Sequence, residues 1–388
     1  MEAVNICAYA RTPIGKFRGS LSKYSATELG AMTVKELLRR AKINPDEGFI
    51  DQLYMGQVLQ AGAGQSPSRQ VALGSGMPYQ TPCTTINKVC GSSLKAVMIG
   101  ASDIRAKVAN LIIAGGMESM SNAPYFIRNP IKGQEINFSD LEWILSYDGL
   151  RDAYSGEMMG ETGETVARDF NISREESDAY AVRSHMLANR GWEKDWLSEE
   201  SFKIDDLEKD EGIRIDTNLE KMKSLKTIFD KNGQVTAGNA SQLSDGASAV
   251  LIASDYAVKR HNLPILAKII DYCTSGLKPS KVMSAPITAI EILLNRNDLT
   301  IDDIDIIEHN EAFASASCSI QKALNIPDEK FNPHGGAVAI GHPLGATGTR
   351  CLMTLVNALN RTSGKFGIVT ICLGGGNAVA MLIEAKII

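Results

Sequence analysis

One order of secondary-structure elements occurs twice along the chain, and this repetition constrains the fold more than any other feature. Residues 4–56 predict a strand, a helix with apolar side chains at helical spacing, and a second strand. Residues 265–308 predict the same order at matching intervals. The predicted strands are residues 4–8, 49–56, 265–273 and 304–308, and the predicted helices are residues 27–41 and 287–294. Strand, helix and strand given twice indicate two copies of one α/β unit.

Each copy ends with a continuous apolar stretch, residues 110–116 in the first and residues 367–372 in the second. Neither stretch alternates apolar and polar side chains. We therefore expect both to be strands that are buried on two faces, in sheets with helices on either side.

Between residues 119 and 243 the amino-acid composition changes. All three tryptophans lie here, together with charge-rich stretches such as residues 199–214. A helix is predicted at residues 173–190, because Ser173 and Glu176 have the spacing of a capping box. We interpret this region as an insertion into the first unit, large enough to cover a site. The expected division is residues 1–118 completed by 244–264, the insertion at 119–243, and a second half at 265–388.

Composition excludes several classes of protein. The chain has 388 residues, of which 44% are hydrophobic and 22% charged, as in soluble proteins with two or three packed units. A net charge of −5 gives no general attraction to nucleic acid, and no stretch is long enough to span a bilayer. The seven cysteines have no metal-type spacing and the first strand begins close to Met1. We therefore expect no metal site, no transit peptide, and a reducing compartment, the cytoplasm.

Cys90 stands between a predicted strand at residues 84–89 and a predicted helix at residues 93–109. The apolar stripe of this helix consists of Leu94, Val97, Met98, Ala101, Ile104 and Val108. Backbone N–H groups and the positive end of a helix favour a thiolate, which predicts a pKa for Cys90 below the ordinary value of about 8.5. Small neighbours, Gly91 and Ser92, leave space for a substrate. A buried, unreactive thiol explains this motif equally well.

His342 lies in a glycine-rich stretch, residues 335–348, and is followed by Pro343. An imidazole held in such a turn can deprotonate a thiol and then hydrogen-bond to an oxyanion. A tight structural turn with an incidental histidine is the alternative. The other four histidines are expected to be structural: His185, His261, His309 and His334.

Asn310 follows a predicted apolar strand, and Cys372 is the last residue of another. The amide of Asn310 can hold a water or an oxyanion, although Asn at a strand end is more often a turn former. Cys372 opens a turn that contains residues 374–376, all glycine, whose N–H groups can face a site. To act as a base, Cys372 needs an electropositive pocket that stabilises its thiolate; otherwise it is a core thiol.

Seven motifs in order resemble those of the thiolase family, along nearly the whole chain. They are residues 10–15, 83–90, 115–121, 236–241 and 310–313, the stretch around His342 and the turn after Cys372. The resemblance implies an α/β thiolase fold of two duplicated halves, each with a five-stranded sheet, in five layers of helix, sheet, helix, sheet and helix. It also implies an inserted loop domain that binds coenzyme A, and an acyltransferase for which coenzyme A is substrate and product, with no other cofactor.

The resemblance implies a role for five catalytic residues. Cys90 matches the nucleophile that accepts the acyl group, and His342 matches the residue that activates it. Cys372 matches the base that removes the α-proton of the second acyl-CoA. Asn310 matches a residue that, through a water, helps His342 hold the enolate oxygen, and the backbone amides of Cys90 and Gly374 match the other oxyanion hole.

The same resemblance implies the substrate contacts. Ser241 matches a pantetheine contact, and Arg214 matches a residue beside the adenine. Residues 81–90 are most similar to short-chain members, which predicts reversible condensation of two acetyl-CoA to acetoacetyl-CoA through acetyl-Cys90. Met158, however, stands where short-chain members usually have His, and His334 where an Asn is usual. A degradative 3-ketoacyl-CoA thiolase of broader chain length is therefore the alternative.

Two other classes fit less well. Ketoacyl synthases lack the Cys372 turn, and a non-catalytic, lipid-binding relative would be expected to lose a site residue. Family resemblance further implies a homodimer or homotetramer in lipid metabolism, with residues 130–140 as a tetramer contact. We expect acetyl-CoA and acetoacetyl-CoA as the binding partners, and neither nucleic acid nor a membrane.

Overall fold

The N-terminal half is built on a five-stranded sheet. A computed structural model describes residues 2–386. The strands are β1 (Asn5–Arg11), β8 (Ser244–Ala253), β5 (Leu111–Ser119), β3 (Gln52–Gly56) and β4 (Cys83–Ile86), in that spatial order, with the short β2 (Gly15–Lys16) beside β8. β3 runs parallel to β4 and β5, and β8 runs antiparallel to β1 and β5. Every residue of β5 and β8 is buried, which confirms the interpretation of residues 110–116.

The C-terminal half repeats this order with one strand fewer. Its strands are β9 (Ala267–Gly276), β12 (Asn377–Ala385), β11 (Phe366–Leu373) and β10 (Ile306–His309). At the position that β4 occupies in the first half, the described residues show a single bridge between Ile307 and Phe331. The expected five strands are therefore four here. A short antiparallel pairing of β1 with β9 joins both halves into one ten-stranded mixed sheet of the described chain.

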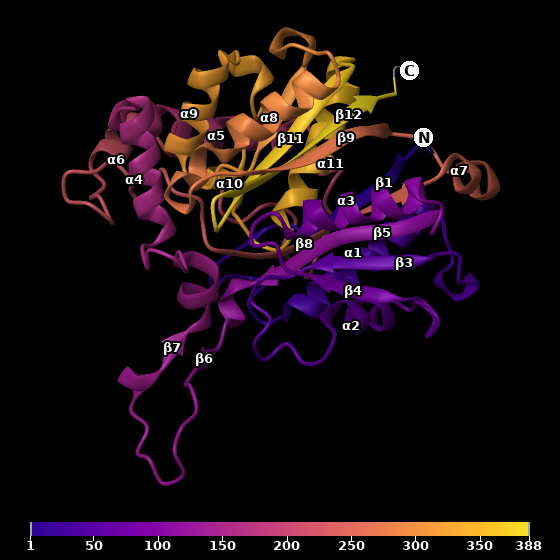
Figure 1. Cartoon of the computed structure of the whole chain (residues 1–388), viewed down its shortest axis with the longest axis horizontal. Helices are drawn as coiled ribbons and strands as arrows, with labels where there is room; N and C mark the ends of the chain where they lie inside the picture. The colour runs from indigo at the N-terminus through magenta and orange to yellow at the C-terminus, as the bar shows by residue number, and fades with distance from the viewer. Residues whose placement is uncertain (1, 387–388) are drawn as a thin grey trace.

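Helices form three layers around these strands (Figure 1). The outer helices of the first half are α1 (Ala26–Ala41) and α2 (Pro67–Gly74), and those of the second half are α8 (Ala285–Arg296) and α9 (Ala314–Leu324). The middle layer contains α3 (Ser92–Arg105) and α11 (Thr347–Thr362), which pack against each other and against strands of both halves. This is the expected helix, sheet, helix, sheet, helix arrangement.

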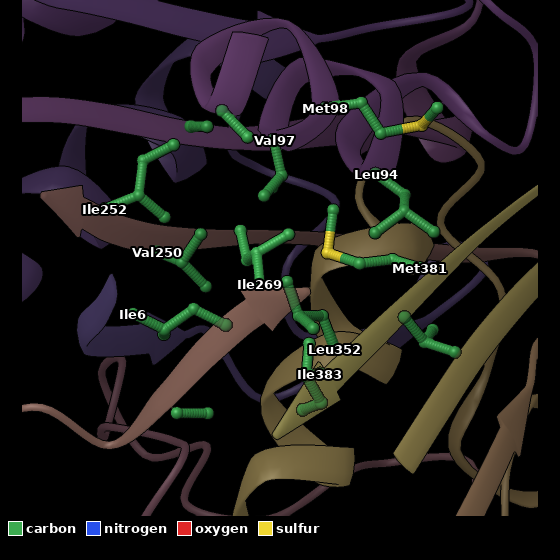
Figure 2. Packing of buried hydrophobic residues seen from close by; sticks show 14 of the residues in the cluster. Ile6, Leu94, Val97, Met98, Val250, Ile252, Ile269, Leu352, Met381 and Ile383 are labelled. Carbon is green, nitrogen blue, oxygen red and sulfur yellow. The ribbon is translucent and has the colours of Figure 1, made fainter. Parts of the chain in front are cut away.

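The pleat of the strands explains why two cores form. In β5, Ile112 contacts the core around α3 and α11, whereas its neighbour Ile113 faces the core around α1. Figure 2 shows the central core, in which Leu94 of α3 and Leu352 of α11 lie among strand residues from both halves. Helices α3 and α11 therefore pack against strands of both halves. The turns that precede these two helices lie at the same end of the fold.

Helix α3 is shorter than its sequence predicts. It ends at Arg105, and Lys107 takes a left-handed conformation with φ of +61°. Val108, which the apolar stripe included, lies outside the helix and is 68% exposed. The spacing of apolar side chains continues past the point where the backbone turns away.

Residues 119–243 form a separate set of helices and short strands beside the two halves. They are β6 (Tyr125–Phe126), β7 (Glu142–Trp143), α4 (Met159–Phe170), α5 (Arg174–Glu193) and α6 (Leu219–Lys223). The predicted capping box is present at α5: Glu176 N–H donates to Ser173 Oγ at 3.2 Å, and Ser173 N–H donates to Glu176 Oε2 at 2.6 Å. The hairpin of β6 and β7 projects far from the body of the molecule (Figure 1).

The remaining helical segments are short. They are α7 (Asp255–His261), α10 (Ala337–Ile340), a π-helical turn at Leu145–Leu150, and 3-10 turns at Pro45–Glu47, Met120–Asn122, Phe138–Asp140, Pro279–Ser284, Ile301–Asp303 and Asp328–Lys330. None of the helices between residues 2 and 386 is long and apolar enough to cross a membrane.

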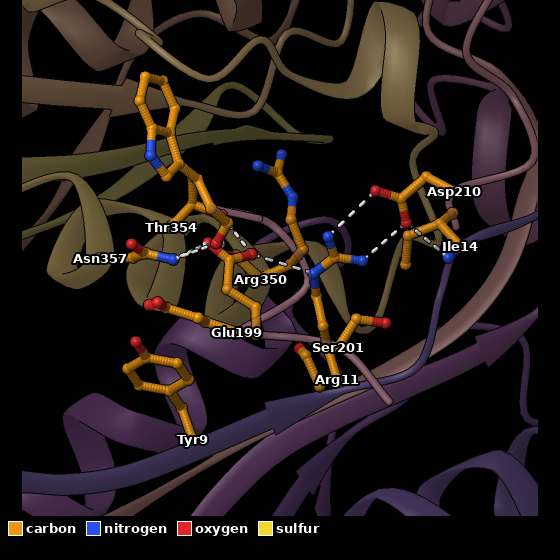
Figure 3. A network of polar contacts seen from close by, with 12 residues as sticks. Tyr9, Arg11, Ile14, Glu199, Ser201, Asp210, Arg350, Thr354 and Asn357 are labelled. Atoms are coloured by element: carbon orange, nitrogen blue, oxygen red, sulfur yellow. Dashed lines mark hydrogen bonds and ion pairs between the residues drawn. The ribbon is translucent and has the colours of Figure 1, made fainter. Parts of the chain in front are cut away.

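A buried charge network ties residues 119–243 to the first half (Figure 3). Arg11, at the end of β1, donates to Asp210 Oδ1 at 2.7 Å and to Glu200 Oε2 at 3.0 Å. Asp210 also accepts from Trp192 Nε1 at 3.0 Å, and Glu200 accepts from Thr354 of α11 at 3.1 Å. All these groups are shielded from solvent. Since removing one member of such a pair leaves an unpaired buried charge, the network firmly anchors this region.

Candidate active site

A narrow cavity of about 50 Å³ lies between the two halves, where several loops meet. Five of the residues singled out from the sequence line it: Cys90, Ser241, His342, Cys372 and Gly374. Apolar side chains form most of the remaining wall, among them Leu150, Met159, Met283, Phe313 and Leu344. The fold thus brings together two thiols and an imidazole in a space that excludes most water.

Cys90 lies in a strained turn between β4 and α3. Val89, a β-branched residue, has a left-handed backbone with φ of +48°, which is rare for its type. Hydrogen bonds hold this turn: Val89 N–H donates to Asn87 Oδ1 at 3.0 Å, and Ser92 Oγ donates to the Val89 carbonyl at 2.6 Å. Gly91 packs so closely against Leu373 that a Cβ atom would collide with that side chain. The turn therefore presents the Cys90 thiol to the cavity.

The expectation of a lowered pKa for Cys90 is wrong. Burial in the apolar cavity raises the pKa of this thiol well above its ordinary value, and the nearby Cys372 raises it further. Backbone N–H groups of Cys90 and Gly374 point toward the sulfur and lower the pKa, but by less than burial raises it. Cys90 therefore rests as a neutral thiol, and its activation requires a base.

His342 is oriented as such a base. Its Nδ1 lies 2.7 Å from Thr347 Oγ1, and the single Thr347 hydroxyl proton is donated to the Pro343 carbonyl at 2.9 Å. Thr347 Oγ1 can then only accept from His342, so the proton of the ring is on Nδ1 and Nε2 carries a lone pair. Among the described residues Nε2 has no hydrogen-bond partner. Burial and, to a lesser extent, Arg350 lower the pKa of His342 to about 3, which keeps the ring neutral.

Asn310 lies behind Cys372 and is absent from the cavity wall. Its Oδ1 accepts from Cys372 N–H at 3.1 Å and from the Cys372 thiol at 3.3 Å, and its Nδ2 donates to the Cys372 carbonyl at 3.3 Å. Burial raises the pKa of Cys372 to about 11. Cys372 is therefore a neutral thiol in its resting state. Among the described residues, no cationic side chain lies beside it to stabilise a thiolate.

The three residues singled out for substrate contact lie at different places. Ser241 lines the cavity, and its N–H donates to the Ala312 carbonyl at 3.0 Å. Met158 lines an adjoining cavity of about 120 Å³, which shares Ser241 and His342 with the first. Arg214 is exposed and lines neither cavity; its backbone N–H donates to His185 Nδ1 at 3.1 Å.

Two buried carboxylates, to which sequence analysis assigned no role, organise the loops of the site. Glu311, next to Asn310, accepts from Tyr180 Oη and Ser184 Oγ of α5, both at 2.8 Å, and from Val338 N–H at 3.1 Å. Glu118, at the end of β5, accepts from three backbone N–H groups. The sequence contained a signal for both: Glu118 and Glu311 are charged residues within otherwise apolar or glycine-rich motifs, residues 115–121 and 310–313.

The remaining histidines have structural surroundings. His309 Nδ1 lies 3.0 Å from Ser317 Oγ, and burial lowers the pKa of His309 to about 3. His334 stacks on Trp196 with ring centroids 5.0 Å apart. No group of three or more His, Cys, Asp and Glu side chains is placed to hold a metal ion in the described part of the chain.

Comparison with known proteins identifies the family. The models "Thiolase, N-terminal domain" and "Thiolase, C-terminal domain" match residues 4–256 and 263–385. The solved structure of human mitochondrial 3-ketoacyl-CoA thiolase in complex with CoA is 37% identical, with a TM-score of 0.95, and the match covers 99% of this chain and 98% of that one. The chain therefore belongs to the thiolase family and is an acyltransferase.

Some relatives within the family carry a more specific name, whereas a Staphylococcus aureus relative that is 38% identical is named a probable acetyl-CoA acyltransferase. The acetyl-CoA acetyltransferase of Cupriavidus necator is 41% identical over 400 residues, which cover 100% of each chain. That of Yarrowia lipolytica is also 41% identical, over 99% of this chain and 97% of its own.

Proposed function

We propose that the chain is an acetyl-CoA C-acetyltransferase, which reversibly condenses two acetyl-CoA into acetoacetyl-CoA and free CoA. The main support is that His342, Cys90 and Cys372 line one cavity. The His342 ring is neutral there, and its Nε2 has no hydrogen-bond partner among the described residues. The names of the relatives support the choice of substrate.

Formation of the acyl-enzyme is the first half of the proposed reaction. His342 Nε2 takes the Cys90 proton, and the Cys90 sulfur attacks the thioester carbonyl of acetyl-CoA. The backbone N–H groups of Cys90 and Gly374, which already point toward this sulfur, stabilise the oxyanion. Collapse breaks the bond to CoA, and the departing sulfur takes a proton from Cys372. The products are acetyl-Cys90, free CoA, a Cys372 thiolate and a protonated His342.

This step explains how a buried thiol with a raised pKa can act as a base. The protonated His342 supplies the positive charge that the resting cavity lacks, so that it forms an ion pair with the Cys372 thiolate. Asn310 holds Cys372 in place through three contacts.

Carbon–carbon bond formation is the second half. The Cys372 thiolate removes the α-proton of a second acetyl-CoA, and His342, assisted by Asn310 through a water, stabilises the enolate oxygen. The enolate carbon attacks the carbonyl of acetyl-Cys90, the bond to the Cys90 sulfur breaks, and acetoacetyl-CoA forms. His342 returns its proton to the Cys90 thiolate, which restores the starting state.

Mass spectrometry of the protein after brief exposure to acetyl-CoA tests this function. An acetyl group is expected on the peptide that carries Cys90, and it should be absent from a Cys90→Ser variant. Acetylation confined to Cys83 or Cys351, or none at all, would contradict the assignment.

A degradative thiolase of broader chain length is the second candidate, and one observation favours it. The cavity that adjoins the site is lined by flexible apolar side chains, including Met120, Met158 and Phe229. Such a wall can adapt to additional methylenes, each stabilised by about 0.8 kcal/mol when buried. We therefore propose a preference for acetoacetyl-CoA with measurable activity on chains of roughly four to six carbons.

The substrate-binding and assembly roles of residues 119–243 are also proposals. Ser241 contacts the pantetheine arm of CoA, and Arg214, exposed on this region, lies toward the adenine end. The β6–β7 hairpin exposes Ile131 and Phe138, which are 76% and 73% accessible, and forms the contact of a homotetramer. We assign the protein to the cytoplasm, because all seven cysteines are free thiols.

A further inference from the structure

Glu118 is a buried carboxylate bonded to the backbone of two separate loops. Its Oε2 accepts from Val58 N–H at 3.0 Å and from Gly345 N–H at 2.9 Å, and its Oε1 accepts from Leu59 N–H at 3.1 Å. Its side chain has no accessible surface. Burial raises the pKa of Glu118 to about 7, and the three N–H donors oppose this increase because they stabilise the ionised form. Hydrogen bonds to the ionised carboxylate are roughly twice as strong as neutral ones, so this form restrains the segments that it joins.

One of these segments is the turn that carries His342. Gly345 follows His342 by three residues, and Leu344 between them lines the cavity. The turn packs tightly on β5, because a side chain at Gly116 would collide with the Gly345 carbonyl. Glu118 therefore sets the position of the His342 turn relative to the sheet of the first half.

The other segment leads to the turn that carries Cys90. The Val58 carbonyl accepts from Asn87 Nδ2 at 3.4 Å, and Asn87 Oδ1 accepts from Val89 N–H at 3.0 Å. Val58 is thus bonded to Glu118 through its N–H and to the Cys90 turn through its carbonyl. A path of hydrogen bonds runs from Gly345 through Glu118, Val58 and Asn87 to the residue before Cys90.

We propose that Glu118 is a positioning residue that holds the Cys90 turn and the His342 turn at the separation that proton transfer between them requires. This inference rests on the proposed pairing of Cys90 with His342. The two turns come from different halves of the fold, so their relative position depends on contacts across the interface. A displacement of about 1 Å between nucleophile and base can cost about a hundredfold in rate, which makes such a restraint valuable.

The variant Glu118→Gln tests the proposal. An amide offers one oxygen acceptor and one N–H₂ donor, so at least one backbone N–H loses its partner. The rate of Cys90 alkylation by iodoacetamide near neutral pH, followed on the Cys90 peptide by mass spectrometry, reports activation of the thiol. The charge of Glu118 raises the pKa of Cys90, so its removal alone would speed alkylation, whereas loss of positioning slows it. We expect positioning to dominate: alkylation should be about tenfold slower in Glu118→Gln, slower still in His342→Ala, and no slower in the double variant than in His342→Ala alone, because Glu118 acts through His342.

Glu164→Gln is the matched control. Glu164 is another buried carboxylate on an element beside the site, and it accepts from the backbone N–H groups of Gln234 and Val235, both at 2.8 Å. Its loss should lower the midpoint of thermal unfolding, as that of Glu118 should, but should leave the alkylation rate of Cys90 unchanged.

Each outcome has a separate meaning. Glu118→Gln with a lowered unfolding midpoint and the wild-type alkylation rate, or with a slowing that adds to that of His342→Ala, would overturn the positioning role. Wild-type alkylation in His342→Ala would instead overturn the pairing on which the proposed function rests. If Glu118→Gln does not fold, Asn87→Ala decides, because this exposed side chain is not needed for the core: the proposal expects slower alkylation, and an unchanged rate would refute it.

Discussion

Replacement of Thr347 by Val should disable His342 without removing it. Thr347 Oγ1 accepts from His342 Nδ1–H at 2.7 Å in a fully buried position, and Val has nearly the same shape but no hydroxyl. The Nδ1–H would lose its partner, so the ring would no longer be held with the lone pair on Nε2. Leaving a buried donor unsatisfied costs about 1–3 kcal/mol. At about 1.4 kcal/mol for each factor of ten, kcat/KM should fall about 5- to 150-fold.

The assay is CoA-dependent cleavage of acetoacetyl-CoA, with Thr349→Val as the matched control. Thr349 lies on the same helix, is equally buried, and bonds with Ser248 Oγ at 2.8 Å, not with His342. Both variants should lower the free energy of unfolding by similar amounts, but only Thr347→Val should lose most of its kcat/KM. Equal kcat/KM values in the two variants would refute the argument that Thr347 selects the tautomer of His342.

Four further outcomes are expected. Cys372→Ser should still acetylate Cys90, but more slowly because the departing CoA loses its proton donor, and should lose the exchange of acetyl α-protons with deuterated solvent; normal exchange, measured by NMR, would reverse the assigned roles. Arg11→Met should lower the free energy of unfolding in urea by about 3–5 kcal/mol, because Asp210 would remain buried without its ion-pair partner and Glu200 would keep only the charge of Arg350; a loss below 1 kcal/mol would mean that water reaches them. Met158→His should raise the ratio of kcat/KM for acetoacetyl-CoA to that for a ketodecanoyl substrate, and a wild-type enzyme that clearly prefers the long chain would make the degradative function the better assignment. The NMR signals of His185, His309, His334 and His342 should not titrate between pH 7 and 5.5 in the folded protein, because burial lowers their pKa values to about 3 or 4. Each of them should lower stability by about 1 kcal/mol over this range, whereas Glu118, with a pKa raised to about 7, acts in the opposite direction; titration of these histidine signals within the range would contradict the lowered pKa values.

Local signals in the sequence were sufficient for most of the elements. The helix at residues 27–41 and the capping box at Ser173 depend on spacings of three or four residues, which operate before any tertiary contact forms. The buried strands β5 and β11 were recognisable because strands covered on both faces are largely apolar and lack the alternation of polar and apolar side chains. The duplicated order of these elements then indicated two similar halves.

Other features depended on contacts that no local pattern describes. The second half lacks a full counterpart of β4, although the order of its other elements matches the first half. The apolar stripe of α3 continues to Val108, but the left-handed conformation of Lys107 ends the helix earlier. Asn310 was expected to hold a water or an oxyanion, and no sequence pattern indicated that its side chain also bonds to the backbone of Cys372.

The sequence by itself determined which side chains are available for the chemistry: Cys90 and His342 in turns that precede helices, and Cys372 near the end of a strand. Only the tertiary structure decided their electrostatic state. The helix end beside Cys90 favours a thiolate, yet enclosure by apolar residues from both halves outweighs it and raises the pKa of the thiol. A helix end is encoded within a few neighbouring residues, whereas desolvation depends on every segment that packs around the site. Such a sum cannot be evaluated until distant parts of the chain have met.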